Sequence, residues 1–240
     1  MALAKIEQLE AAIKASQIRG MFARIARRYD LINRFVSFGR DSAWRQTAVE
    51  SVGVGAHSLV LDVATGTAEL ATRLARSAGS VVAVDFCWEM MKLGREKVKT
   101  AGVQPKIQFV LADALTLPFK DGSFDCATVG FAMRNVASIS DTFAELWRII
   151  KPGGYVVCLE LSRPHSPVFA ALHRFYLHRV IPILGHWMSG DDRAYTYLPD
   201  SIARFPTADQ LKAIMEGVGL CQVRYKLLNL GAVSLHIGVK

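Results

Sequence analysis

The sequence of 240 residues has few cysteines and no long apolar run. Its four cysteines, Cys87, Cys126, Cys158 and Cys221, form no Cys-x-x-Cys pair, so we interpret them as small hydrophobic side chains in a reducing cytosol. No stretch reaches the roughly 18 uncharged apolar residues of a membrane-spanning helix. The N-terminus carries acidic residues within its first ten positions and has no apolar core, which does not fit a signal peptide. We therefore expect a cytosolic protein.

Composition and charge restrict the class further. Hydrophobic residues make up 51% of the chain and charged residues 21%, which excludes intrinsic disorder and a coiled coil. The net charge of +8 is unevenly distributed: residues 1–50 carry nine Lys/Arg against five Asp/Glu, residues 51–162 carry eleven of each, and residues 163–240 again carry nine against five. The two basic flanks predict an anionic partner, for which nucleic acid and anionic lipid both qualify.

Short apolar runs alternate with helical stretches through the middle of the chain. The runs lie at residues 58–64, 81–85, 107–113, 126–132 and 155–161, and the helical stretches at 68–78, 89–100 and 140–150. This alternation predicts an α/β fold in which helices cover both faces of a parallel sheet. Two final strands, 221–228 and 232–239, are joined by a short link and predict an antiparallel hairpin.

No repeat and no Pro/Ser/Gly-rich linker divides the chain, so we predict one domain over residues 1–240. Its expected parts are an N-terminal helical cap (1–50), a cofactor-binding core (51–162), an insertion that faces substrate and membrane (163–206), and a C-terminal helix and hairpin (207–240).

A candidate site follows the first predicted strand, in VLDVATGTAELA (60–71). Ligands of open α/β sheets bind at the carboxyl ends of the strands, where this glycine turn is expected. The turn has a single glycine, Gly66, and so matches neither the GxGxxG dinucleotide fingerprint nor a P-loop. A phosphate cradle is therefore disfavoured.

Acidic residues at successive strand ends indicate another ligand. Asp62 lies inside the first strand, Asp85 ends the second, and Asp113 ends the third. Asp85 also follows Gly66 by 19 residues, the spacing at which a carboxylate meets a ribose diol. A single aspartate at a strand end is often only a turn former. Several together beside a glycine turn favour a cationic nucleoside, such as S-adenosylmethionine.

The motifs LDVATGT (61–67), VVAVD (81–85), ADALTLPF (112–119), FDCATVGFAMRNV (124–136) and RIIKPGG (148–154) resemble those of class I S-adenosylmethionine-dependent methyltransferases. Residues 21–45 and 130–164 resemble the two signatures of the menaquinone/ubiquinone C-methyltransferases (UbiE/MenG), and residues 195–215 are also similar. The resemblance implies a Rossmann-like fold: a seven-stranded, mostly parallel sheet with an antiparallel C-terminal hairpin and a helical cap.

The resemblance also implies the reaction, which is methylation of a ring carbon in a prenylated hydroquinone. A naphthoquinol (demethylmenaquinol) is favoured, and the benzoquinol of ubiquinone biosynthesis stays open. Alternatives are a methyltransferase acting on another small hydrophobic acceptor and a cofactor-binding protein that has lost catalysis. A nucleic-acid methyltransferase is disfavoured, because the chain has no NPPY-type motif and no appended RNA-binding module.

Site residues follow from the resemblance position by position. Those implied for the cofactor are Asp62, Gly66, Thr67, Glu69, Asp85, Asp113, Ala114 and Gly130. Those implied for catalysis are Tyr29, Asp30, Arg134 and Asn135, and Asn33 joins Arg134 on the substrate side. We expect Arg134 to stabilise a phenolate and Asn135 to orient the other oxygen. Ala68 stands where the family commonly has glycine, which costs nothing only if its φ is negative.

A prenylated acceptor resides in a bilayer, which gives the basic flanks a role. Residues 15–50 and 164–190 interleave arginines with apolar side chains, so we expect weak peripheral binding to the inner face of a membrane. The histidines at 165, 173, 178 and 186 lack the spacing of a helical metal pair, and no metal is predicted. The oligomeric state, including a homodimer, is left open.

Overall fold

The computed structural model describes residues 2–181 and 192–240. Its helices are α1 (Ala2–Val36), α2 (Asp41–Glu50), α3 (Glu69–Ser77), α4 (Trp88–Thr100), α5 (Ile139–Ile149), α6 (Pro167–Phe175), α8 (Asp192–Arg204) and α9 (Ala208–Gly217). Shorter helical turns are η1 (Gln104–Lys106), η2 (Met133–Asn135), the π-helical η3 (Tyr176–Val180) and η4 (Asn229–Gly231). The strands are β1 (Leu59–Val63), β2 (Ser80–Asp85), β3 (Ile107–Leu111), β4 (Phe124–Gly130), β5 (Ile150–Leu161), β6 (Cys221–Leu228) and β7 (Val233–Val239).

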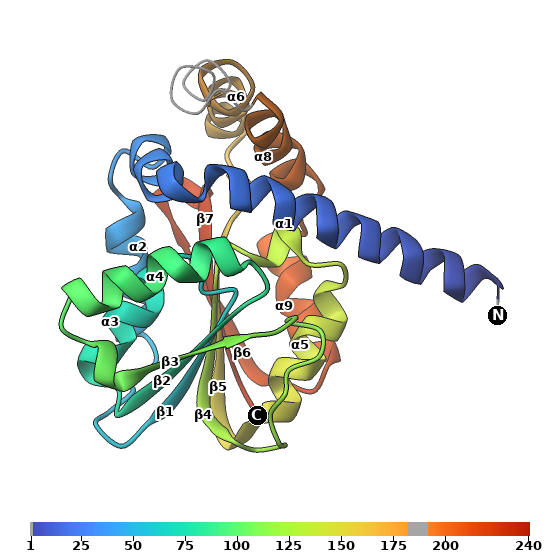
Figure 1. The fold of residues 1–240 in the computed structure, drawn as a ribbon. Helices are drawn as coiled ribbons and strands as arrows, with labels where there is room; N and C mark the ends of the chain where they lie inside the picture. The colour runs from blue at the N-terminus through green and yellow to red at the C-terminus, as the bar shows by residue number, and fades with distance from the viewer. Residues whose placement is uncertain (1, 182–191) are drawn as a thin grey trace.

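These strands form one sheet in the order β3-β2-β1-β4-β5-β7-β6 (Figure 1). β1 to β5 run parallel, while β7 pairs antiparallel with both β5 and β6. The order reverses on either side of β1, and such a reversal opens a crevice at the carboxyl ends of the strands. The predicted fold class is confirmed, including the C-terminal hairpin.

The core has two layers because apolar side chains alternate between the faces of the sheet. On β1, for example, Val60 packs with α3 side chains such as Leu74, whereas Leu61 packs with Phe143 of α5. All four side chains are fully buried. This two-sided burial explains why the central strands read as continuous apolar runs.

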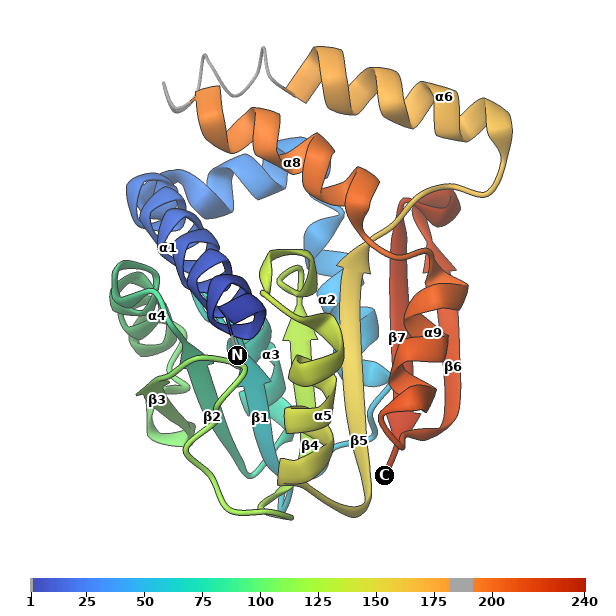
Figure 2. The same cartoon turned by 90° about the vertical axis from the view of Figure 1, so that its right-hand side faces the viewer.

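A helical cap covers the carboxyl ends of the strands (Figure 2). α1 crosses the sheet as one long helix, and α6 and α8 lie beyond it (Figures 1 and 2). Met21, Ile25 and Ile32 of α1 share an apolar cluster with Leu177 of η3 and Ile202 of α8. α1 and the η3 and α8 parts of the C-terminal flank therefore pack on each other above the sheet.

One detail differs from the sequence prediction, and one part of the prediction falls outside the described residues. β5 begins at Ile150 rather than near residue 155, because Ile150 already pairs with Phe124 before a bulge resets the register at Cys126. Residues 182–191 of the predicted 163–206 insertion, including His186, lie outside the described residues. Within the described part of the chain, no helix is long and apolar enough to span a membrane.

Candidate functional site

The turn after β1 is held by Asp85, at the end of β2. The backbone N–H of Gly66 donates to Asp85 Oδ2 at 2.7 Å, and the N–H of Cys87 donates to Oδ1 at 2.8 Å. Gly66 has φ +57°, a left-handed conformation that glycine adopts without strain. The 19-residue spacing seen in the sequence thus corresponds to a direct contact between turn and strand end.

The Asp85 carboxylate is buried but still has free hydrogen-bond acceptor positions. The side chain is 5% exposed, and desolvation raises its pKa from 3.8 to about 6, opposed by the hydrogen bonds from Cys87 and Gly66. A carboxylate offers about four lone-pair positions, of which the backbone occupies two. Asp85 can therefore accept further hydrogen bonds, such as those of a diol.

A cavity of about 290 Å³, here the first cavity, opens beside Asp85. Of the predicted site residues it is lined by Tyr29, Gly66, Asp85, Asp113, Ala114, Gly130 and Asn135. Ala12, Ala15 and Phe22 of α1 close it on the cap side. A Cβ built on Gly130 would approach Leu70 Cδ2 to 3.3 Å, so a larger residue there would require the Leu70 side chain to shift by a few tenths of an ångström. The cavity therefore presents the free acceptor positions of Asp85 to a ligand.

Asp62 does not line this cavity. It is 1% exposed, and its two oxygens accept from the hydroxyls of Thr65 and Thr128, each at 2.7 Å. Desolvation raises its pKa from 3.8 to about 6. Asp62 therefore ties the glycine turn to β1 and β4 and lies behind the cavity wall.

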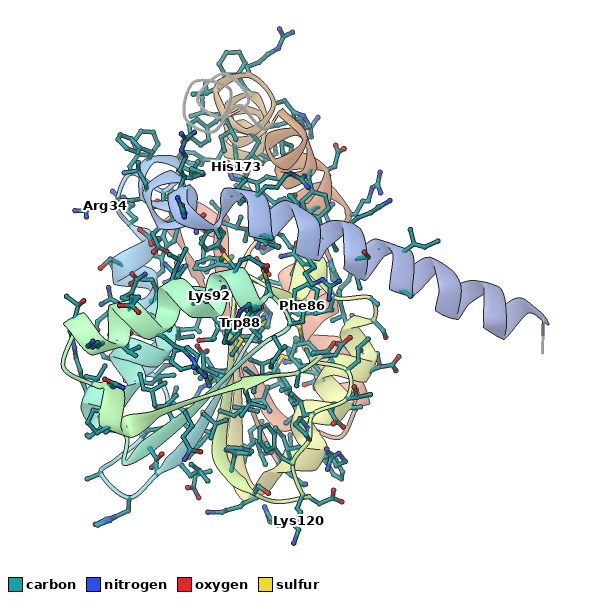
Figure 3. The ribbon with its side chains drawn as sticks, viewed as in Figure 1. Arg34, Phe86, Trp88, Lys92, Lys120 and His173 are labelled. Carbon is teal, nitrogen blue, oxygen red and sulfur yellow. The ribbon has the colours of Figure 1, made fainter. Side chains whose placement is uncertain are left out.

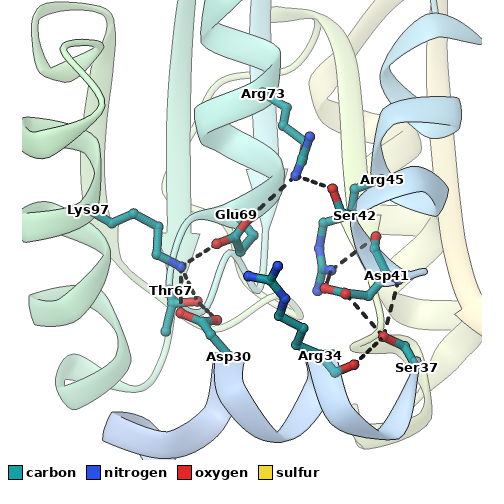
Figure 4. A network of polar contacts seen from close by, with 10 residues as sticks. All are labelled: Asp30, Arg34, Ser37, Asp41, Ser42, Arg45, Thr67, Glu69, Arg73 and Lys97. Atoms are coloured by element: carbon teal, nitrogen blue, oxygen red, sulfur yellow. Dashed lines mark hydrogen bonds and ion pairs between the residues drawn. The ribbon is translucent and has the colours of Figure 1, made fainter. Parts of the chain in front are cut away.

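Three further predicted residues, Asp30, Thr67 and Glu69, form a polar network instead (Figure 4). Lys97 of α4 bridges Asp30 Oδ2 at 2.5 Å and Glu69 Oε1 at 2.6 Å. The Thr67 hydroxyl donates to Asp30 Oδ1 at 2.6 Å. None of the three lines the first cavity. They join α1 to α4 and to the first turn of α3, and so hold the cap on the core.

Ala68 has φ +60°, so its φ is not negative and an alanine in place of glycine is strained here. A left-handed alanine costs about 1–2 kcal/mol relative to the right-handed form. Its Cβ lies against Gly94 of α4, where an added Cβ would come within 3.2 Å. Ala132, which also lines the first cavity, has φ −125° and carries no such strain.

A second cavity, of about 430 Å³, lies between the sheet and the cap. Its apolar lining includes Val36, Leu161, Leu177, Leu198 and Ile202. Asn33 and Arg134, the predicted substrate residues, line this second cavity rather than the first. Figure 3 places His173, another lining residue, at the capped end of the molecule and Lys120 at the opposite end.

Phe131 lines both cavities and separates them. It has φ +58°, and its N–H donates to Leu159 O at 2.7 Å. The Arg45 guanidinium carbon lies 5.0 Å from the centroid of the Phe131 ring, and the ring centroids of Trp44 and Phe131 are 6.2 Å apart. A bulky side chain in the left-handed region persists only where its surroundings fix it, and such strain often marks a functional site.

Arg134 is fixed by an ion pair with Glu160 at the end of β5. Arg134 Nη1 lies 2.5 Å from Glu160 Oε1 and also donates to Phe131 O at 2.7 Å. Glu160 is fully buried and Arg134 nearly so. Desolvation lowers the pKa of Arg134, but the charge and hydrogen bond of Glu160 together with the electrostatic effects of Tyr29 and Tyr197 outweigh it, and the net pKa shift is upward. The guanidinium is therefore a permanent cation and hydrogen-bond donor.

Sequence reasoning missed several of these residues. Glu160 and Phe131 lie within the signature at 130–164, but nothing local distinguishes them from strand residues. Tyr197 of α8 donates to Asn135 Oδ1 at 2.9 Å across 62 residues of sequence. Lys97 resembles any exposed helical lysine. The described residues hold no group of three or more side chains placed to bind a metal ion.

Comparisons with known proteins agree with this geometry. A family model described as the ubiE/COQ5 methyltransferase family matches residues 10–240. A demethylmenaquinone methyltransferase of Thermus thermophilus is 43% identical over 91% of this chain and 99% of that protein. A ubiquinone/menaquinone biosynthesis C-methyltransferase of Geotalea daltonii is 41% identical over 95% of this chain and 97% of that protein.

Solved structures show the same fold at lower identity. A SAM-dependent methyltransferase of Thermotoga maritima superposes with a TM-score of 0.65 at 17% identity, covering 93% of this chain and 99% of that one. One from Aquifex aeolicus gives a TM-score of 0.60 at 18% identity, covering 81% and 88%. These likenesses support the fold alone.

Proposed function

Because the chain belongs to the ubiE/COQ5 methyltransferase family, whose members use S-adenosylmethionine, we propose that it methylates a ring carbon of a prenylated hydroquinone. Demethylmenaquinol is the favoured acceptor, since relatives bearing that activity in their names match nearly the whole chain. The observation that carries the proposal is the pair of cavities that meet at Phe131.

The first cavity suits S-adenosylmethionine. Asp85 would accept the ribose hydroxyls, Asp113 and Ala114 lie where the adenine is expected, and Gly66 lets the backbone approach closely. Bound there, the cofactor would supply a sulfonium methyl group: a ring carbon would form the new C–C bond, the S–C electron pair would stay on sulfur, and the ring would lose a proton. Thr67, Glu69 and Asp30 act indirectly in this proposal, by holding α1 in place.

The second cavity suits the acceptor. Its apolar lining excludes water and accommodates the start of a prenyl chain, while Arg134 offers a cation beside Phe131. A hydroquinone becomes nucleophilic at carbon when a neighbouring hydroxyl loses its proton, and Arg134 stabilises the resulting oxyanion. Arg134 is already protonated and cannot take the proton itself, so in this proposal the proton passes to water.

We also propose peripheral membrane binding through the capped end. Exposed apolar side chains gather at the end of α1 and on α6: Phe35, Phe38, Val168, Leu172 and Phe175. Phe38 and Tyr176 have ring centroids 5.6 Å apart, which places the two groups side by side. Arg34 and Arg174 are exposed nearby. An apolar surface beside basic side chains suits an anionic bilayer.

The decisive experiment is methyl transfer in an anaerobic assay with purified protein, S-adenosylmethionine and a prenylated naphthoquinol. We expect a product heavier by one methylene, no product from the oxidised quinone, and at least a hundredfold lower turnover for Arg134→Ala. Cofactor affinity, measured by calorimetry, should be unchanged in that variant. Cofactor binding by the wild type without transfer to either a naphthoquinol or a benzoquinol would contradict the proposed acceptor.

A further inference from the structure

The second cavity is lined by two buried arginines that are held in the same way. Arg45 Nη1 lies 2.6 Å from Asp41 Oδ2, and Arg134 Nη1 lies 2.5 Å from Glu160 Oε1. Both also contact Phe131, Arg45 over its ring and Arg134 at its carbonyl oxygen. The carboxylates thus fix each guanidinium through a single nitrogen beside the partition between the cavities.

Arg45 retains hydrogen-bond donors for a ligand. Its hydrogen bonds, to Asp41 O and Asp41 Oδ2, both use Nη1. Among the described residues, Nε and Nη2 of Arg45 have no hydrogen-bond partner, and neither atom is sealed from solvent. The side chain lines the cavity although the residue is only 6% exposed. These donors are therefore available to a group inside the cavity.

The charge of the cavity favours an electron-rich oxygen. Its lining has three arginines, Arg40, Arg45 and Arg134, and one carboxylate, Asp41, while Glu160 outside the lining pairs with Arg134, so one cationic charge is left over. Desolvation lowers the pKa of His173, so this fourth basic group is neutral at pH 7. An apolar cavity with surplus cation suits an amphiphilic acceptor whose head carries negative charge.

Asn135, expected to orient the second oxygen, does not line this cavity. It lines the first cavity, on the other side of Phe131, and its Oδ1 accepts from the Tyr197 hydroxyl at 2.9 Å. A 1,4-hydroquinone has two oxygens on opposite sides of its ring, and Arg134 can serve only one of them. The remaining cation beside Phe131 is Arg45.

We propose that Arg45, positioned by Asp41, binds the oxygen of the acceptor that is remote from the carbon to be methylated. Arg134 binds the adjacent oxygen, and the two guanidiniums fix the ring against Phe131 with its reacting edge toward the first cavity. The inference rests on the proposed function. It adds a substrate-binding residue from α2, outside the residues expected from the sequence.

The first test compares Arg45→Met with Arg76→Met, which removes an arginine from the exposed end of α3. Loss of a hydrogen bond to a charged group weakens binding about tenfold to hundredfold. We expect Arg45→Met to raise the acceptor KM by that factor, with cofactor affinity unchanged, and Arg76→Met to behave as wild type. An unchanged KM in Arg45→Met overturns the inference.

Removing Arg45 leaves Asp41 without its partner, so the double variant Asp41→Asn/Arg45→Met guards against misfolding. It carries no unpaired carboxylate and should melt near the wild-type temperature. We expect it to show the same raised KM. A double variant that folds and binds the acceptor with wild-type KM overturns the inference as well.

The second test changes the substrate. A quinol whose remote hydroxyl is converted to a methyl ether cannot become an oxyanion there, so the wild type should use it about tenfold to hundredfold less efficiently than the free quinol. In Arg45→Met this discrimination should disappear. Equal discrimination in both proteins overturns the role of Arg45. A wild type that methylates neither compound instead overturns the proposed function itself, so the two failures are distinguishable.

Discussion

The ammonium group of Lys97 lies 2.5 Å from the Asp30 carboxylate, so an ion pair joins α4 of the core to α1 of the cap. The same ammonium reaches Glu69 Oε1 at 2.6 Å, at the start of α3. α1 supplies Phe22 and Tyr29 to the wall of the first cavity. Lys97 therefore anchors the helix that covers the first cavity, the proposed cofactor site.

Replacing Lys97 by Met should loosen this cover. Partly exposed ion pairs contribute up to about 1 kcal/mol each, so the closed state should lose about 1 kcal/mol, or about fivefold in population. We expect S-adenosylhomocysteine to dissociate about fivefold faster, as measured by stopped-flow fluorescence. Lys212→Met is the control, because Lys212 pairs with Glu216 on α9, away from the site. Equal release rates in the two variants would disprove a covering role for the Lys97 pair.

Cofactor affinity should fall in mild acid because Asp85 titrates there. If only the ionised carboxylate accepts the ribose hydroxyls, a pKa of about 6 predicts about tenfold weaker binding at pH 5 than at pH 7. Asp85→Asn should bind about tenfold to hundredfold more weakly at pH 7 and should lose the pH dependence. Calorimetry at both pH values measures this. A pH dependence that persists in Asp85→Asn would assign it to another group, such as Asp62.

The contribution of Asp85 to the stability of the free protein should depend on pH in the opposite direction to cofactor affinity. Burial raises the pKa of Asp85 above its ordinary value of 3.8, so between pH 3.8 and about 6 the folded state binds more protons than the unfolded chain. The contribution of Asp85 to the free energy of unfolding therefore rises as the pH falls through 6 and is constant below 3.8. Denaturant titrations of wild type and Asp85→Asn at pH 7 and 5 isolate this contribution. A larger contribution at pH 7 than at pH 5 would contradict the assignment.

The sequence predicted the sheet and the first cavity well for a physical reason. Gly66, Asp85, Asp113 and Gly130 all lie at or just beyond the carboxyl ends of parallel strands, which meet at one edge of the sheet whatever else packs on it. Local patterns thus sufficed to bring these residues together.

The positions of Thr67 and Glu69 could not be predicted in that way. They adjoin the same turn, but their side chains contact Lys97 and Asp30, and this depends on how α1 packs on α4. Phe131 and Arg45 likewise meet only because α2 packs beside the end of β4. Contacts between distant segments leave no periodic signal, so the second cavity emerged only from the structure.

Glu160→Gln should be strongly destabilising. The substitution leaves the buried Arg134 guanidinium without its counter-charge, and breaking a buried ion pair on one side costs about 3–5 kcal/mol. Denaturant unfolding should show this loss, whereas Arg134→Met/Glu160→Gln should recover much of the stability and remain inactive. A loss below about 1 kcal/mol in Glu160→Gln would mean that the pair is not desolvated as the structure indicates.

The capped end should bind anionic vesicles in a salt-sensitive way. Phe38 is 78% exposed, and burying a phenylalanine side chain contributes about 1.5–3 kcal/mol, so Phe38→Ser should weaken binding at least tenfold. Arg34→Ala should weaken it about fivefold on anionic vesicles only, at about 1 kcal/mol per basic side chain near the surface. The control is Leu111→Ser, which removes an exposed apolar side chain from edge strand β3.

Sedimentation with phosphatidylserine-containing and neutral vesicles, at low and high salt, measures these affinities. We expect wild type and Leu111→Ser to bind the anionic vesicles alike and to dissociate as salt rises, because screening weakens the arginine contribution. Equal binding to neutral and anionic vesicles would remove the electrostatic part of the proposal. Equal loss in Phe38→Ser and Leu111→Ser would show that the surface around α6 is not the docking surface, since both variants lose one exposed apolar side chain and only Phe38 lies against Tyr176, which follows α6.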